Sequence, residues 1–183
     1  MADWNAADSI AVARPACWDN YPCQNRITIM NQSTIKRIAV IRGILRADPA
    51  TVVAGDLRPG SQNPSSGVQT WDEFLAIMNG GSQGAFDIWS NEELPENQFY
   101  ATTMPGGRNR WLVIGQLLYE PIALNRATAE IRYFPEAGDS VVFGDIDRFV
   151  GDILLGNKYC QVVPKGDRDA WWKIIQEADR IAD

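Results

Sequence analysis

The longest run of large apolar residues lies near the middle of the chain, from Arg110 to Tyr119. If this segment, RWLVIGQLLY, forms a strand, it places apolar side chains on both faces, because successive side chains point in opposite directions. A strand that is apolar on both faces is usually central in its sheet and covered on both sides. We therefore expect this segment to be the strand around which the fold is built.

Other segments with strand-like patterns flank this one. Alternating polar and apolar residues at Arg26–Asn31 and an isoleucine-rich run at Ile35–Leu45, separated by a turn, predict an antiparallel hairpin. Short runs bounded by turn residues predict the remaining strands, at Gly84–Trp89, Asn97–Thr103, Thr128–Phe134, Ser140–Phe143 and Tyr159–Val163. Together with a short segment at 50–54, these give seven to nine strands.

Three segments have the residue spacing of a helix. Thr70 and Glu73 are spaced as in a capping box, and they predict a short helix at 71–78. Apolar residues recur every three to four positions after Asp145, which is placed to cap that helix. Asp167 is placed in the same way before a last helix, and both late helices are expected to pack on the sheet.

The predicted fold class is α+β: an antiparallel sheet or sandwich with a short central helix and two C-terminal helices. We expect residues 25–183 to form one domain, β-rich over 25–144 and mixed helix and strand over 145–183, after an N-terminal arm at 1–24. The predicted core comprises Ile29, Ile38, Val40, Phe86, Ile88, Leu112, Ile114, Leu118, Ile131, Val142 and Val162.

Composition narrows the classes of protein to consider. The chain has 183 residues, of which 45% are hydrophobic and 22% charged, as is usual for a globular protein. Its net charge of −6 opposes general nucleic-acid binding, which requires a basic surface. The first residues lack the pattern of a signal peptide, and no apolar run reaches the roughly 20 residues of a membrane span. A cytoplasmic or particle-associated location is therefore expected.

The absence of histidine excludes several common catalytic sites. Ser–His and Cys–His pairs and His-ligated zinc are not available, so catalysis would have to use carboxylates, Lys, Tyr, Cys or Ser–Lys pairs. The three cysteines, Cys17, Cys23 and Cys160, do not complete a tetrahedral zinc site. A Cys17–Cys23 disulfide and free thiols both remain open. No cofactor is expected.

The best cluster of carboxylates is Asp145, Asp147 and Asp152, with Glu136 and Asp139 nearby. Several oxygen ligands together could hold calcium or magnesium, but the spacing matches no EF-hand. Asp145 is already explained as a helix cap, and Asp147 lies in the first turn, where the helix dipole favours an anion. We interpret this cluster as structural and predict no metal.

Tryptophan and arginine supply the candidate binding residues. The chain contains seven tryptophans, whose ordinary role is packing in cores and interfaces. Arg108 and Arg110, beside Trp111, could hold an anion or a sugar, although turn arginines more often face solvent.

Three short patterns between residues 25 and 115 are shared with a known family: Ile27-x-Ile29-x-Asn31-x-Ser33, Gly81 followed by Gly84-x-Phe86-Asp87, and Pro105-Gly106 with Asn109 before a strand. In these patterns the segment resembles the aegerolysins, which are small acidic β-sandwich proteins. Members of that family bind membrane lipids through aromatic and acidic loop residues, and some act with a larger pore-forming partner. The resemblance implies that Trp71, Trp89 and the loop at 56–67 are the places to look for a ligand. The capping box at Thr70 and the helices after residue 145 depart from the family pattern.

Three classes of function are open. A structural, assembly or interaction protein, such as a particle or tail subunit, fits the acidic chain and the lack of a catalytic motif; it predicts self-association or a protein partner. The alternative is a lipid- or glycan-binding, toxin-like module, which predicts exposed tryptophan at one end of the sheet. A second alternative is a carboxylate-dependent enzyme, which predicts a cleft with acids whose pKa values are pushed apart.

Overall fold

The structure, a computed structural model, describes residues 30–48, 51 and 53–182. Its centre is one open antiparallel sheet in which each strand pairs with the next strand along the chain. The six strands are β1 (Gly81–Gln83), β2 (Phe86–Ile88), β3 (Trp111–Leu117), β4 (Glu120–Asn125), β5 (Ile131–Tyr133) and β6 (Val141–Gly144). The predicted α+β class is confirmed, with six strands in the described residues where the sequence predicts seven to nine.

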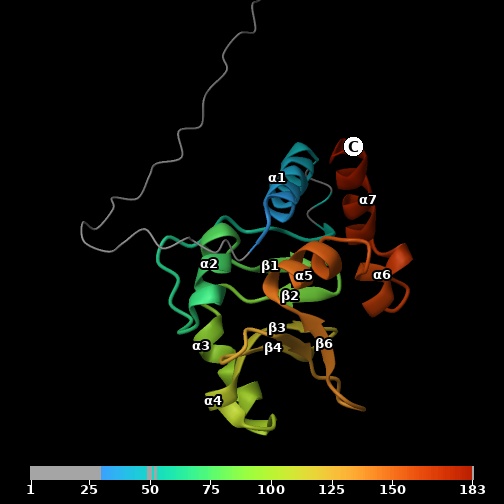
Figure 1. The fold of residues 1–183 in the computed structure, drawn as a ribbon. Helices are drawn as coiled ribbons and strands as arrows, with labels where there is room; N and C mark the ends of the chain where they lie inside the picture. The colour runs from blue at the N-terminus through green and yellow to red at the C-terminus, as the bar shows by residue number, and fades with distance from the viewer. Residues whose placement is uncertain (1–29, 49–50, 52, 183) are drawn as a thin grey trace, which may run out of the picture.

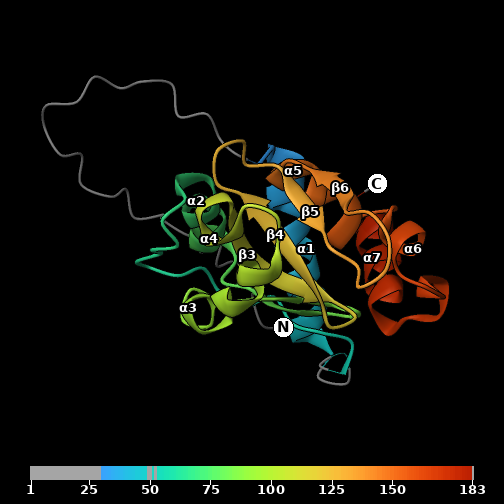
Figure 2. The ribbon, with the colours of Figure 1, turned by 90° about the horizontal axis from the view of Figure 1, so that it is seen from below.

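Helices lie on both sides of the sheet (Figure 1). Figure 1 shows α1 and α7 side by side on one side of it and α4 on the other, and Figure 2 looks at the sheet from the α4 side. The α-helices are α1 (Gln32–Ala47), α2 (Gln69–Ile77), α3 (Leu94–Asn97), α4 (Gly107–Arg110), α5 (Ile146–Arg148), α6 (Tyr159–Val162) and α7 (Ala170–Ala182). Two short 3-10 helices, η2 (Gln98–Thr103) and η4 (Gly166–Arg168), and the π-helical turns η3 (Phe149–Leu154) complete the fold.

Strand register assigns each side chain to one face of the sheet, because paired residues of antiparallel strands share a face. Phe86 pairs with Leu117, and its ring lies 6.2 Å from Phe149 and 5.9 Å from Tyr159, centroid to centroid. This first face therefore packs against η3 and α6. On the second face, Val113 of β3, Ala123 of β4 and Arg132 of β5 are paired in a row across the sheet. Helix η2 covers only part of this row.

Most of the predicted core residues are buried. Six of them are fully packed: Ile38, Phe86, Ile88, Leu112, Ile114 and Ile131. Val40 and Val162 are half-buried. The prediction was wrong for Leu118 and Val142, which are exposed because one lies at the tip of a hairpin and the other on an edge strand. Ile29 and the N-terminal arm at 1–24 lie outside the described residues.

The predicted hairpin at 26–45 is wrong. Ile35–Leu45 belongs to helix α1, on which the buried residues Thr34, Ile38 and Ile41 follow one another at helical spacing. Asn31, expected at the end of a strand, caps this helix and accepts a hydrogen bond from the Thr34 backbone N–H at 2.8 Å. Residues 26–29 lie outside the described part of the chain. The isoleucine content of the segment favoured a strand, but tertiary packing outweighs such propensities.

Two further predicted strands are helical. Asn97–Thr103 falls mainly in η2, where the Gln98 side-chain amide donates to the Val113 carbonyl at 2.8 Å and accepts from its N–H at 3.1 Å. The Gln98 side chain thus replaces a neighbouring strand beside β3, beyond the end of β2. Tyr159–Val163 forms α6, which is one helical turn that ends before Pro164.

The predicted helices are confirmed, although two of their caps are not. Helix α2 matches the prediction at 71–78, but Val68 is its N-cap and Thr70 makes no capping hydrogen bond. Asp145 caps α5 as predicted, accepting from the Arg148 N–H at 2.9 Å. The last helix is capped by Asp169 instead of Asp167, since Asp169 accepts from the Trp171 N–H at 3.0 Å.

One carboxylate joins the start of the described chain to the segment that follows β6. Asp147 accepts hydrogen bonds from the Asn31 backbone N–H at 2.8 Å, the Asn31 side-chain amide at 2.6 Å and the Thr34 hydroxyl at 2.9 Å. The start of α1 is therefore fixed to α5. Asp152 forms an ion pair with Lys158 at 2.6 Å. Each member of the predicted aspartate cluster thus has a structural partner, as the structural interpretation requires.

We expect Asp147→Ala to lower the free energy of unfolding by about 1–3 kcal/mol, because three hydrogen bonds to a carboxylate are lost at a helix start. Urea unfolding followed by tryptophan fluorescence measures this change. Asp139→Ala is the matched control: this exposed turn carboxylate should change stability by no more than about 0.5 kcal/mol. An equal loss in both variants would contradict the role of Asp147.

Candidate functional site

A groove opens on the second face of the sheet, where η2 leaves it uncovered. Its volume is about 490 Å³, within the range of small-ligand pockets. Three segments that are distant in sequence form its walls: η2 and the residues after it, the β3–β4 turn, and the β5–β6 connection. We call it the aromatic groove; it is lined by Tyr100, Thr103, Met104, Pro105, Tyr119, Glu120, Pro121, Phe134, Pro135 and Glu136.

Aromatic packing holds the walls of the groove. The Trp111 ring meets Phe134 edge to face, with 5.0 Å between centroids, and its indole N–H donates to the Pro105 carbonyl at 2.9 Å. On the η2 wall, Tyr100 stacks between Trp89 and Phe99 at 5.8 and 4.2 Å. Because Trp89, Trp111, Tyr100 and Phe134 belong to the core or pack against it, the groove is pre-formed.

The β3–β4 turn has an unusual sequence for its backbone. Leu117 pairs with Glu120, so the turn has two central residues, Leu118 and Tyr119. Both have positive φ, +51° and +73°, which is typical of a type I′ turn that ordinarily contains Asn-Gly. These two side chains are also exposed, by 46% for Leu118 and 84% for Tyr119. A strained backbone that presents apolar side chains to solvent is a feature associated with binding sites.

Two carboxylates give the groove a negative charge. Glu120 accepts hydrogen bonds from the Tyr133 hydroxyl and, at 2.7 Å, from the Glu136 N–H, and these bonds lower its pKa below the usual glutamate value. Burial, and then the bond to Glu120, raise the pKa of Tyr133 to about 12. The Glu136 carboxylate is exposed and has no partner among the described residues. None of the ten residues that line the groove is basic.

The two predicted binding tryptophans are buried. Trp71 lies in α2 and stacks on Phe74, with 4.3 Å between centroids, so its side chain belongs to the core. Trp89 is packed beneath Tyr100 and supports the groove wall without lining it. The loop at 56–67 is irregular as predicted, but it lies along α2 and α1: Ser61 N–H donates to the Leu75 carbonyl at 2.8 Å, and the Arg42 guanidinium donates to the Arg58 carbonyl at 2.8 Å.

The two predicted binding arginines lie at the Trp111 end of β3, on α4. The Arg110 guanidinium lies over the Trp111 ring, 5.1 Å from its centroid. Arg108 donates to the Gln98 carbonyl at 3.0 Å and so attaches α4 to η2. Both arginines are exposed, and neither lines the aromatic groove.

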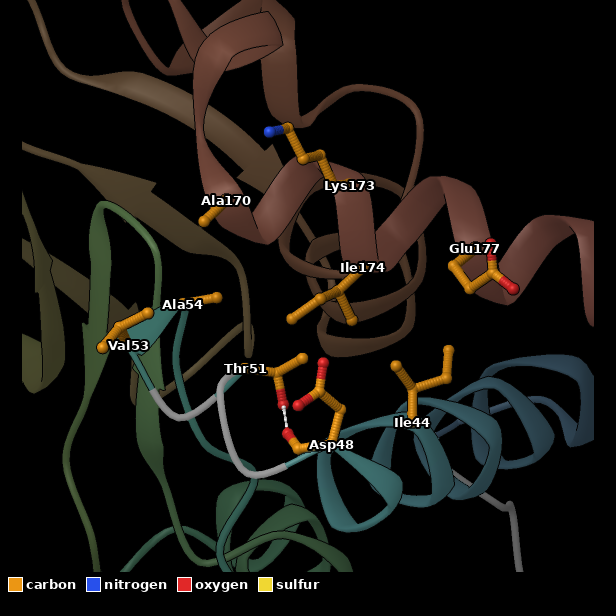
Figure 3. A pocket seen from close by; sticks show the side chains of 9 residues that line it. All are labelled: Ile44, Asp48, Thr51, Val53, Ala54, Ala170, Lys173, Ile174 and Glu177. Atoms are coloured by element: carbon orange, nitrogen blue, oxygen red, sulfur yellow. Dashed lines mark hydrogen bonds between the residues drawn. The ribbon is translucent and has the colours of Figure 1, made fainter.

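A second cavity, of about 320 Å³, lies between α1 and α7 (Figure 3). Ile44 and Ile174 point toward each other across it, and the Thr51 hydroxyl donates to the Asp48 carbonyl at 2.6 Å on one side. Residues 49, 50 and 52, which neighbour Asp48, Thr51 and Val53 in the sequence, lie outside the described residues, so the aromatic groove is the better-defined candidate.

The described residues contain no cluster of three or more Cys, Asp or Glu side chains suited to a metal ion. No helix in the described part of the chain has the length and apolar character of a membrane span.

The sequence pattern does not predict the aromatic groove. It predicts a central strand that continues through Leu118 and Tyr119, because Leu-Tyr carries no turn signal. A signal was nevertheless available: a second apolar run, Ile122–Leu124, follows Pro121 closely enough for a two-residue hairpin.

Comparison of the sequence with protein-family models finds no match, and comparison with curated proteins also finds none. These comparisons therefore give no support to the resemblance to aegerolysins. Two of the residues on which it rests, Asn31 and Ser33, lie at the start of helix α1.

Relieving the strained turn should stabilise the fold. We expect the double variant Leu118→Asn/Tyr119→Gly to raise the free energy of unfolding by about 1–3 kcal/mol, because both new residues tolerate positive φ. Leu118→Ala/Tyr119→Ala removes the same side chains but keeps the strain, so it should give no gain. Urea unfolding of both variants measures the difference, and a gain in the alanine control would contradict the interpretation.

The Tyr133–Glu120 bond should make stability depend on alkaline pH. With a folded pKa of about 12 against an ordinary value of about 10, Tyr133 keeps its proton more tightly in the folded state. Its contribution is therefore complete below pH 10 and is lost as the pH rises from about 10 to 12. Urea unfolding at pH 8 and pH 11 should show a smaller pH-dependent loss for Tyr133→Phe than for the wild-type chain. Equal losses would contradict the assignment.

Proposed function

We propose that this chain is a non-enzymatic interaction protein that binds an extended cationic segment of a protein partner in its aromatic groove. The observation that carries this proposal is the strained β3–β4 turn, which holds Tyr119 exposed at the edge of the groove. A turn sequence such as Asn-Gly would satisfy the fold at lower cost, so Leu118 and Tyr119 are better explained by a contact outside the chain.

The chemistry of the groove defines the kind of segment that fits. Exposed tyrosine, phenylalanine and proline surfaces bind apolar or proline-containing stretches, because such contacts bury apolar area. The carboxylates of Glu120 and Glu136 favour Lys or Arg in the same stretch. The low pKa of Glu120 keeps this charge present well below neutral pH.

The charge of the groove also bears on the other classes of function. An anionic membrane surface is recognised by basic residues, which the lining of this groove does not supply. A carboxylate acting as a general acid needs a raised pKa, whereas that of Glu120 is lowered. A second copy of this chain would bring a net charge of −6 to an acidic groove, which disfavours it as the occupant.

Selection from a phage-displayed library of random peptides tests this proposal. We expect the wild-type chain to enrich peptides that combine Lys or Arg with aromatic, aliphatic or proline residues. Tyr119→Ala should weaken binding of the enriched peptides by about tenfold or more, and Glu136→Lys should remove the preference for basic residues. Glu177→Lys, the same charge reversal on α7, is the matched control and should leave the selection unchanged.

Three outcomes would overturn the proposal. The first is no enrichment, or enrichment that survives both groove substitutions. The second is binding to a glycan or liposome panel that depends on Tyr119 while no peptide binds, which would favour the alternative module. The third is a concentration-dependent increase of mass in light scattering that requires Tyr119, which would make a second copy the occupant.

A further inference from the structure

The two edges of the sheet are not equivalent. The edge at β1 is covered by residues 54–58: Asp56 N–H donates to the Ser82 carbonyl at 2.6 Å, and Gly84 N–H donates to the Ala54 carbonyl at 3.1 Å. At the other edge, strand β6 pairs only with β5 among the described residues. Its outward backbone groups therefore have no protein partner in that part of the chain.

The β6 edge is short and carries a bulge, which both limit pairing, but it lacks two other common protections of an exposed edge. Natural edge strands commonly carry a charge or a proline within the strand, but Val141–Gly144 has neither. Val141 and Val142 are exposed by 45% and 48%. A bulge in the pairing with β5 places Phe143 in the core, stacked on Phe149 at 5.7 Å, so the usable edge is short and centred on the two valines.

The charges around β6 indicate what kind of strand could pair with it. If β6 paired antiparallel with a second copy about Val142, Asp139 of one chain would lie opposite Asp145 of the other, and like charges placed so are destabilising. Arg132 is already paired with Glu130 at 2.5 Å. The exposed Arg148 side chain packs on Gly144, at the end of β6. A strand with basic residues at its ends fits this edge better than a second copy does.

The edge and the aromatic groove lie on one continuous part of the sheet. Val142 pairs with Arg132, so its side chain lies on the second face of the sheet. Phe134, two residues after Arg132 in the chain, lies on the same face. Residues Phe134, Pro135 and Glu136 of the connection between β5 and β6 line the groove. A strand added at β6 would therefore direct alternate side chains toward the groove side.

We propose that the outer edge of β6 binds the partner's segment as an added antiparallel or parallel β-strand, with its basic residues near Asp139 and Asp145. This inference rests on the proposed function, because the added strand belongs to the same partner segment that fills the aromatic groove. The short edge supplies main-chain hydrogen bonds that fix the register, and the groove supplies most of the affinity.

Backbone N-methylation of the most enriched peptide tests strand addition. Two versions of the peptide are synthesised: one is methylated at the odd-numbered amides and the other at the even-numbered amides. In a β-strand alternate amides point to opposite sides, so methylation in one phase should weaken binding by about tenfold or more and in the other phase have little effect. Equal effects in both phases would overturn strand addition. If the unmethylated peptide still required Tyr119, the proposed function would stand.

Two further measurements use the full chain. Hydrogen exchange of the outward amides in Val141–Gly144 should be fast in the free protein and at least about tenfold slower with saturating peptide. Protection already present in the free protein would show that the edge is covered, and would overturn the inference.

Val142→Lys should weaken peptide binding, whereas Val53→Lys, at a valine that is 91% exposed beside α7, should not. Equal binding by Val142→Lys and the wild-type chain would also overturn the inference.

Discussion

Strand β3 is buried along almost its whole length, so the elements around it have to cover two apolar faces. The first face is covered thoroughly, by the aromatic rings of η3 and α6 against Phe86. Among the described residues, the second face is covered by η2 and the short helices next to it. Because this second layer is short, it leaves part of the face open, and the aromatic groove is a direct result of that unequal coverage.

The segments that were predicted correctly are those in which one pattern dominates. A strand that is apolar on both faces has to be covered on both sides, which favours a central position in the sheet. The apolar residues of α2, α5 and α7 recur at helical spacing, which would not place them on one face of a strand. At Ile35–Leu45, by contrast, β-branched residues favoured a strand while the spacing of Ile38 and Ile41 also fitted a helix. The deciding contacts are made with distant segments, such as the bond from Asp147 to Asn31, which no local pattern contains.

The candidate site was much less predictable than the fold. The resemblance to aegerolysins pointed to Trp71 and Trp89 as binding residues, but tryptophan is ordinarily a packing residue, and both are buried. The residues that do line the groove come from three separate segments that only the sheet topology brings together. The turn at Leu118 and Tyr119 was missed because it breaks the residue preferences on which turn prediction depends.

The same departure from local rules connects the groove with the open edge. Sequences that fold well usually agree with their structure at every level, and the exceptions gather at functional sites. Three such exceptions in this chain are the strained turn with exposed Tyr119, the Glu136 carboxylate, which has no partner among the described residues, and the valine-rich edge without a charge inside the strand. They lie on the same stretch of sheet, between the β3–β4 turn and β6, whereas the β1 edge follows the ordinary rules and is covered. Under the proposed function, a single partner segment would contact all three features, because the groove and the β6 edge are joined through the β5–β6 connection.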